Sequence, residues 1–287
     1  MKHIIVPIDF SKESLNGLRL ALIFANQFKS NVQMVYVQRV VTEIGRVMIE
    51  EEHKTAVQNF EKLIDEYASK LHDGLELTYI IKKGKVYREV VNQAAAFEDT
   101  AVICSTHGAS GFEEFFLGSN AFKIVSATEA PVITIRHGSV PREIRKIVMP
   151  IDITSDTRQK VPITTEIAKA FGAEIHVVAV SSNQSDDIVT KLNAYTKQVC
   201  DYIKDYDVQF KTAKLNGDNI TDIIIEYALD INADMISIMT EQSLSITNFV
   251  LGTYAQQMLS KSPIPVLSVT PQELFILGSF ITQGKPY

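Results

Sequence analysis

The chain has 287 residues, of which 46% are hydrophobic and 22% are charged, as in ordinary folded globular proteins. That length exceeds a typical single core and fits two domains. The 28 Lys and Arg residues stand against 34 Asp and Glu residues, giving a net charge of −6, which argues against non-specific nucleic-acid binding because that needs a basic surface.

The first half of the chain alternates strand-like and helix-like segments. HIIVPID predicts a strand, Ser11 predicts the cap of a helix, and NVQMVYV predicts a second strand. Apolar residues at three- and four-residue spacing from Val57 to Leu71 predict an amphipathic helix. The remaining predicted elements are, in order, the strand LELTYII, the helix VYREVVNQAAAF, the strand TAVICST, a helix from about Ser119 and the strand PVITIR.

This alternation predicts a parallel sheet whose strands are joined by right-handed helical crossovers. Apolar runs such as AVIC fit strands that are covered on both faces. We therefore expect a Rossmann-like, doubly wound α/β domain with five parallel strands in the order 3-2-1-4-5. In such sheets, ligands bind at the carboxyl ends of the strands, where the strand order reverses.

The chain repeats this unit. IIVPIDFS at 4–11 returns as IVMPIDIT at 147–154, and LGSNAFKIVSATEAPVITI at 117–135 returns as LGTYAQQMLSKSPIPVLSV at 251–269. A repeat of this length indicates two copies of one fold. We expect tandem domains over 1–138 and 145–287, joined by the linker RHGSVPREIRK at 136–146.

A glycine-rich loop, STHGASGFEEFFLGSNAFK at 105–123, follows the fourth predicted strand. Gly118 would let a phosphate approach, and the backbone amides of Ser119 and Asn120 would be first-turn donors without helical partners. The bland alternative is that the glycines only make a turn and that Ser119 only caps the helix.

Over nearly its whole length the chain resembles the universal stress protein family in its tandem form. The resemblance rests on VPIDFS, on THGASGFEEFFLGS, and on APVITI with its second-copy partner IPVLSV. It implies ATP binding through the pattern Gly-x2-Gly-x9-Gly-Ser/Thr, whose last three defined positions fall on Gly108, Gly118 and Ser119. It also implies that Asp9 contacts the adenine or ribose end and that Val37 lines the base pocket.

The expected nucleotide site of the first domain therefore comprises Asp9, Val37, Ser105, His107, Gly108, Gly118, Ser119 and Asn120. We expect His107 to have a positional role in the loop rather than to act as a base or a metal ligand. Ser105 stands where the family pattern has its first glycine. A serine there costs about 1–2 kcal/mol if the position needs a positive φ, and little if φ is negative.

The second domain departs further from the pattern. Met239 and Gln242 replace the two earlier glycines, and Glu241 adds a carboxylate that would repel a triphosphate. Asp152 and Val180 remain at the places of Asp9 and Val37. We expect a degenerate copy without nucleotide.

The sequence predicts no catalytic or metal-binding residues. The six histidines show no ligand spacing, and no Walker-type GxxxxGK[ST] is present. We therefore expect a stress-response regulatory protein that binds ATP, with or without Mg²⁺, and is not an enzyme beyond slow incidental hydrolysis. The alternative is an interaction module of the same fold that acts through a protein partner without nucleotide.

The remaining expectations concern location and assembly. MKHIIVPIDFSKES lacks a signal-peptide pattern, no apolar run is long enough to cross a bilayer, and Cys104 and Cys200 are not equivalent in the repeat. A cytoplasmic protein with reduced thiols follows, with no membrane or nucleic-acid contact. The β-prone strands at 131–136 and 265–269 would pair the two domains within the chain. The apolar tail after Pro271 would pack on a domain or on a second subunit of a homodimer.

Overall fold

The computed structural model describes residues 1–38, 46–106, 118–136, 140–240, 242–243 and 250–272. The chain divides into two compact units, Met1–Arg142 and Glu143–Tyr287. We call them the first unit and the second unit and describe each by itself.

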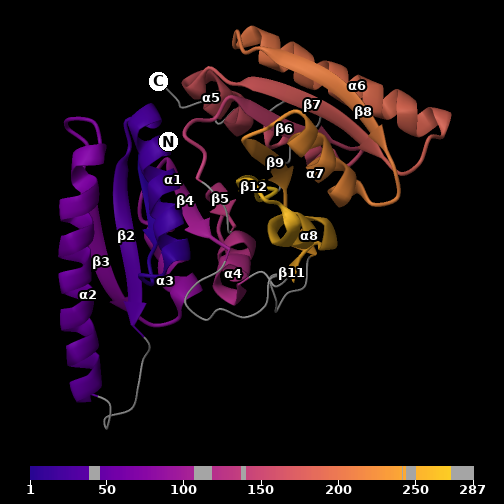
Figure 1. Ribbon diagram of the computed structural model, residues 1–287. Helices are drawn as coiled ribbons and strands as arrows, with labels where there is room; N and C mark the ends of the chain where they lie inside the picture. The colour runs from indigo at the N-terminus through magenta and orange to yellow at the C-terminus, as the bar shows by residue number, and fades with distance from the viewer. Residues whose placement is uncertain (39–45, 107–117, 137–139, 241, 244–249, 273–287) are drawn as a thin grey trace. The chain divides into compact units, whose positions relative to one another are not determined.

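The first unit has five parallel strands in the order β3-β2-β1-β4-β5 (Figure 1). Its strands are β1 (His3–Pro7), β2 (Asn31–Gln38), β3 (Leu77–Lys83), β4 (Thr100–Ser105) and β5 (Val132–Ile135). Its helices are α1 (Lys12–Phe28), α2 (Arg46–Tyr67), α3 (Val86–Ala95) and α4 (Ser119–Ala127), with a short 3₁₀ turn at Ala68–Lys70. The predicted strand order is confirmed.

The second unit repeats this sheet as β12-β9-β6-β7-β8, again with parallel pairing. Its strands are β6 (Lys146–Ile151), β7 (Glu174–Ser181), β8 (Phe210–Asn216), β9 (Met235–Met239) and β12 (Val266–Val269). Its helices are α5 (Val161–Phe171), α6 (Asp186–Asp205), α7 (Ile220–Asp230) and α8 (Thr253–Lys261). A 3₁₀ turn at Ser155–Arg158 and a small antiparallel pair, β10 (Gln242–Ser243) with β11 (Val250–Leu251), complete the described elements.

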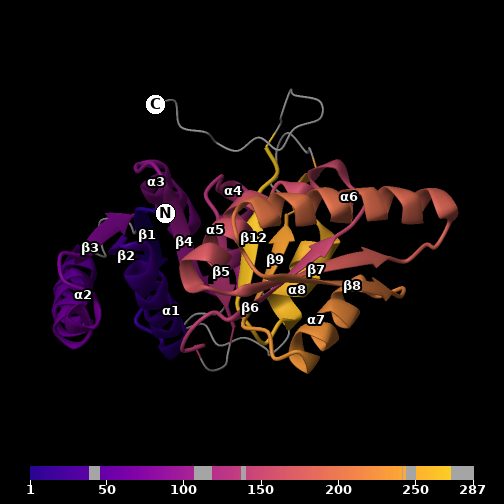
Figure 2. The same ribbon diagram turned by 90° about the horizontal axis from the view of Figure 1, so that it is seen from above.

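Each sheet lies between two pairs of helices, as a doubly wound fold requires. Figure 2 shows α1 and α2 on one face of the first sheet and α3 and α4 on the other. In the second unit, α5 and α6 cover one face, and α7 and α8 cover the opposite face. The strand order reverses between β1 and β4 in the first unit and between β6 and β9 in the second, which fixes the ligand-binding end of each sheet.

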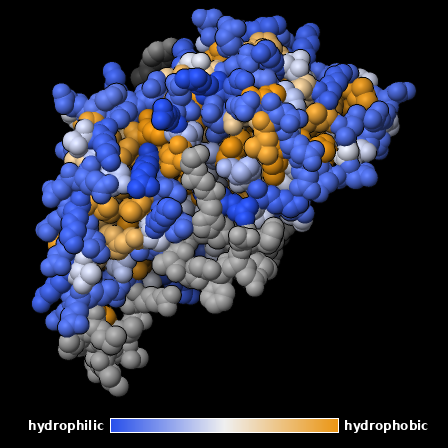
Figure 3. All heavy atoms as spheres, in the orientation of Figure 1, coloured by the Kyte–Doolittle hydropathy of each residue, from blue (hydrophilic) through white to orange (hydrophobic). Residues whose placement is uncertain are grey.

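The sequence pattern explains this packing. The central strands are buried along their length; for example, Ile4, Ile5 and Val6 of β1 are all 0% exposed. The predicted stripe on α2 buries Phe60 and Tyr67. On the face in Figure 3, hydrophilic residues predominate, with smaller apolar areas between them. The only large hydrophobic side chains that are exposed among the described residues are Val189 and Leu229, so burial of apolar surface accounts for both cores.

Within the described part of the chain, no helix combines the length and apolar character of a membrane span.

Candidate functional site

The carboxyl ends of β1, β2 and β4 form the candidate site of the first unit. Pro7 pairs with Val35 in β2, and Ile5 pairs with Val102 in β4. Continuing this register places Asp9 level with Val37, and Ser105 lies at the end of β4 on the other side of β1. The topology therefore brings these three predicted residues together at the carboxyl end of the sheet.

Asp9 is held in a fixed turn after β1. Its Oδ1 accepts hydrogen bonds from the Ser11 backbone N–H at 3.0 Å and from the Ser11 hydroxyl at 2.5 Å. The Ser11 Oγ in turn accepts from the Ser14 N–H at 3.1 Å and so caps α1, as predicted. Asp9 is exposed, so its anchored carboxylate is accessible to a ligand.

The N-terminus of α4 lies at the same sheet edge. The Gly118 N–H donates to the Thr106 carbonyl at 2.7 Å, which ties the start of the helix to the end of β4. Gly118 is the N-cap residue, and no side chain caps the helix. The N–H groups of Ser119 and Asn120, both exposed, donate to no acceptor among the described residues. Such a helix start carries partial positive charge and favours an anion.

Ser105 adopts ordinary strand geometry. It pairs with Ile135 of β5 as the last residue of β4. Among the described residues, the non-glycine positions with positive φ are Phe10, Lys29, Asp99, Asp207 and Asn232, and Ser105 is not one of them. A serine at this place therefore carries no left-handed strain, and the second of the two alternatives for this position holds.

Two predicted site residues, His107 and Gly108, lie outside the described residues. Val37 is buried at the end of β2, with 8% of its surface exposed. The described remainder of the predicted set (Asp9, Val37, Ser105, Gly118, Ser119 and Asn120) comes from β2 and from the segments at and after the ends of β1 and β4.

Aromatic side chains next to Asp9 were missed by the sequence reasoning. Phe10 has a φ of 63°, which turns the chain sharply after Asp9. Its ring lies 5.2 Å from that of Tyr36 and 4.9 Å from that of Phe60. Burial raises the pKa of Tyr36 to about 12, helped by its 2.6 Å hydrogen bond to Glu52. The alternation of Tyr36 with buried residues in β2 was the one available signal.

The second unit keeps the aspartate turn. Asp152 Oδ1 accepts from the Thr154 N–H at 2.8 Å and from the Thr154 hydroxyl at 2.6 Å, as Asp9 does from Ser11. A cavity of about 650 Å³ opens at the carboxyl ends of β6, β7 and β9, and Asp152 and Val180 line it. The copy that we expected to be degenerate thus retains a ligand-sized crevice.

Lys160 lines this cavity and was also missed. In the repeat, Lys160 stands where the first unit has Gly17, which was the signal that could have found it. A Cβ on Gly17 would meet the Ser105 backbone nitrogen at 3.3 Å, so glycine allows α1 to pack closely on β4. In the second unit Pro162 lies in the first turn of α5, where its missing N–H costs nothing, and the preceding residues form a 3₁₀ turn.

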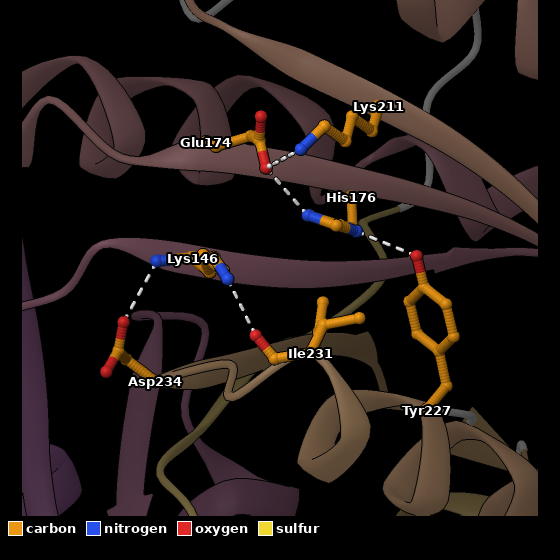
Figure 4. Close-up of polar contacts among 7 residues, drawn as sticks. All are labelled: Lys146, Glu174, His176, Lys211, Tyr227, Ile231 and Asp234. Atoms are coloured by element: carbon orange, nitrogen blue, oxygen red, sulfur yellow. Dashed lines mark hydrogen bonds and ion pairs between the residues drawn. The ribbon is translucent and has the colours of Figure 1, made fainter.

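A further polar cluster lies where β7 begins, away from the crevice (Figure 4). His176 makes hydrogen bonds through Nδ1 to the Tyr227 hydroxyl at 2.7 Å and through Nε2 to Glu174 at 2.8 Å. Lys211 pairs with the same Glu174 oxygen at 3.2 Å. Partial burial alone would raise the pKa of Glu174, but the hydrogen bonds from His176 and Lys211 outweigh it and lower that pKa. The cluster ties β7, β8 and α7 together and has a structural role.

Two other candidates are weak on the described residues. Burial raises the pKa of the Cys104 thiol to about 12, so it stays protonated and unreactive at neutral pH. No group of three or more His, Cys, Asp or Glu side chains within the described ranges is arranged to hold a metal ion.

The fold defines a class of protein: a tandem pair of Rossmann-like α/β domains. In each domain the ligand-binding end of the sheet lies where the strand order reverses. The sequence matches the universal stress protein family twice, over residues 1–136 and 143–270. A relative, universal stress protein MJ0531 of Methanocaldococcus jannaschii, is 25% identical over 145 residues, which are 47% of this chain and 82% of that protein. The chain belongs to the universal stress protein family.

Solved structures agree in fold. A universal stress protein from Archaeoglobus fulgidus superposes with a TM-score of 0.77 at 18% identity, covering 93% of this chain and 98% of its own. A putative universal stress protein from Pseudomonas aeruginosa gives a TM-score of 0.67 at 16% identity and covers 94% of each chain. At these identities the likeness supports the tandem architecture and nothing finer.

Proposed function

We propose that the first unit binds an adenine nucleotide, ATP with or without Mg²⁺, and that the protein acts through this binding as a stress-response regulator rather than as an enzyme. The observation that carries the proposal is the uncapped N-terminus of α4. Its first N–H groups are free of acceptors among the described residues, and they lie at the strand-order reversal beside Ser105. A phosphate group is the ligand chemistry that suits such a helix start.

The opposite side of the crevice suits the nucleoside. The Asp9 carboxylate, anchored by Ser11, has the chemistry to accept hydrogen bonds from hydroxyl or amino groups. Val37, level with Asp9 at the end of β2, offers apolar surface nearby. This arrangement separates an anion-binding end from an apolar end, as an adenine nucleotide requires.

The direct test is a calorimetric titration of the full chain with ATP and Mg²⁺, using Gly118→Asp and Gly118→Asn. Gly118 has φ −54° and ψ 131°, a backbone conformation open to any residue, and both replacements are good helix caps. Both variants should therefore fold, but only aspartate places a charge at the phosphate position.

We expect Gly118→Asp to weaken ATP binding about a thousandfold, since two unit charges 4 Å apart at an effective dielectric constant of 20 repel by about 4 kcal/mol. Gly118→Asn should weaken it less than about tenfold. If Gly118→Asp binds ATP as the unchanged protein does, or if the unchanged protein binds none, the proposal fails. The interaction module without nucleotide would then be the better account.

A further inference from the structure

The crevice of the second unit differs in chemistry from that of the first. Its volume of about 650 Å³ is in the range of small-molecule sites. Met239 lines it at the place where the first unit has Ser105. Its apolar lining includes Ile153, Val180, Ile188, Ile220, Ile238 and Met239. The ligand that fits such a wall has an apolar body.

Lys160 is a buried cation that lines the same cavity. It is 2% exposed, and its Nζ donates to the Thr157 carbonyl at 2.5 Å and to the Thr157 hydroxyl at 3.2 Å. An ammonium has three N–H donors, and the third has no acceptor among the described residues. Burial lowers the pKa of Lys160 to about 8, against the opposing effect of Asp152. One donor of this buried ammonium is therefore left over, and a bound anion would supply its acceptor.

The two aspartates that line the same cavity disfavour ligands with several negative charges. Asp152 and Asp156 both line it, so its three charged side chains sum to one negative charge. A triphosphate or another polyanion would be repelled by these carboxylates. A single oxyanion placed against Lys160 gains a charge-assisted hydrogen bond and meets less of this repulsion, because it carries one charge rather than several.

We propose that the second-unit crevice binds a small organic carboxylate, with its oxyanion against Lys160 and its apolar body along Ile238 and Met239. This site is independent of nucleotide binding by the first unit. The competing explanation is that Lys160 only stabilises the 3₁₀ turn through Thr157.

The test uses the full chain and a panel of probes: octanoate, 4-phenylbutyrate and 2-naphthoate, each paired with its neutral primary amide. Binding is followed by calorimetry and by the methyl resonance of Met239, which reports on this crevice alone. At pH 7 we expect at least one carboxylate to bind with a dissociation constant below about 1 mM, and about tenfold or more tighter than its amide. Inorganic phosphate and ATP should leave the Met239 resonance unchanged.

Lys160→Met keeps an unbranched side chain of nearly the same length and removes its charge, and Lys169→Met is the matched control on the exposed side of α5. We expect Lys160→Met to abolish the preference for carboxylate over amide, and Lys169→Met to retain it. Without any substitution, the preference should also shrink between pH 7 and about pH 9.5 as Lys160 loses its proton. The proposal is overturned if no carboxylate is preferred over its amide, if Lys160→Met keeps the preference, or if phosphate binds in the carboxylates' place.

Discussion

Gly17 of the first unit and Lys160 of the second hold equivalent places in the repeat, yet they serve opposite purposes. Gly17 lets α1 pack against the Ser105 backbone, whereas Lys160 sits between a 3₁₀ turn and α5 and lines a cavity. The same holds deeper in the fold, where Gln93 donates to Gln33 at 2.6 Å in the first unit and His176 bonds Tyr227 in the second. Duplication has preserved the backbone frame, while single side chains have changed the chemistry.

The largest expected effect comes from placing a lysine at position 17, as the second unit has at position 160. Gly17→Lys should destabilise the first unit by at least about 3 kcal/mol, because it forces a side chain against the Ser105 backbone and buries an ammonium without a partner. Chemical denaturation would measure this loss. Gly17→Ala is the control: its 3.3 Å contact is tight, but alanine favours a helix by about 1 kcal/mol, so the net change should stay within about 1 kcal/mol. Equal stability of Gly17→Lys and the unchanged protein would contradict the assigned role of Gly17.

Lys160 should make the stability of the second unit depend on alkaline pH. Its pKa in the folded state is about 8, against 10.5 for a free lysine, so between these values the unfolded chain holds a proton that the folded chain has released. Stability from this group therefore rises with pH across that window, by roughly 3 kcal/mol. Below about pH 8 Lys160 is charged in the folded state, and the full cost of burying that charge lowers the stability of the second unit.

Lys160→Met should remove this rise. The measurement is the difference in unfolding free energy between the two proteins at pH 7 and pH 10.5, which cancels other titrating groups. The charged groups that line the cavity with Lys160 are Asp152 and Asp156. A difference that does not change with pH would show that the Lys160 charge is already compensated.

The two aspartate turns offer a subtler comparison. Asp9→Ala and Asp152→Ala each remove hydrogen bonds to the residue two positions on, Ser11 or Thr154, and should each cost about 1–2 kcal/mol of stability. Only Asp9→Ala should also weaken ATP binding. Thermal unfolding with and without ATP separates the effect on stability from the effect on binding. A loss of ATP affinity in Asp152→Ala would contradict the proposal that only the first unit binds the nucleotide.

The fold was predictable because its signals are local and repeated. Apolar runs such as AVIC, the Ser11 cap and the returning IVMPIDIT fix strand, helix and copy number, and the structure confirms each. The alternation of strands and helices predicted the parallel pairing within each sheet. The pairing of the two domains through their last strands stays a prediction.

The sites were less predictable because they depend on contacts between distant segments. The φ of Phe10, the strand geometry of Ser105 and the close packing of Gly17 are set by tertiary neighbours. Counting glycines in the second copy predicted a copy without nucleotide, which stays a prediction, but it could not show that Lys160, before the helix that Pro162 begins, lies beside a cavity. The spacing of glycines indicates where a phosphate could approach the backbone, but it gives no information on other kinds of ligand.

The central claim is that the two units have diverged in ligand, with the nucleotide confined to the first. Native mass spectrometry of the full chain with ATP and Mg²⁺ tests it most directly, using Gly118→Asp and the equivalent Gly252→Asp. We expect one ATP per chain in the unchanged protein, none in Gly118→Asp and still one in Gly252→Asp. Two nucleotides per chain, or a nucleotide lost in Gly252→Asp and kept in Gly118→Asp, would contradict the claim.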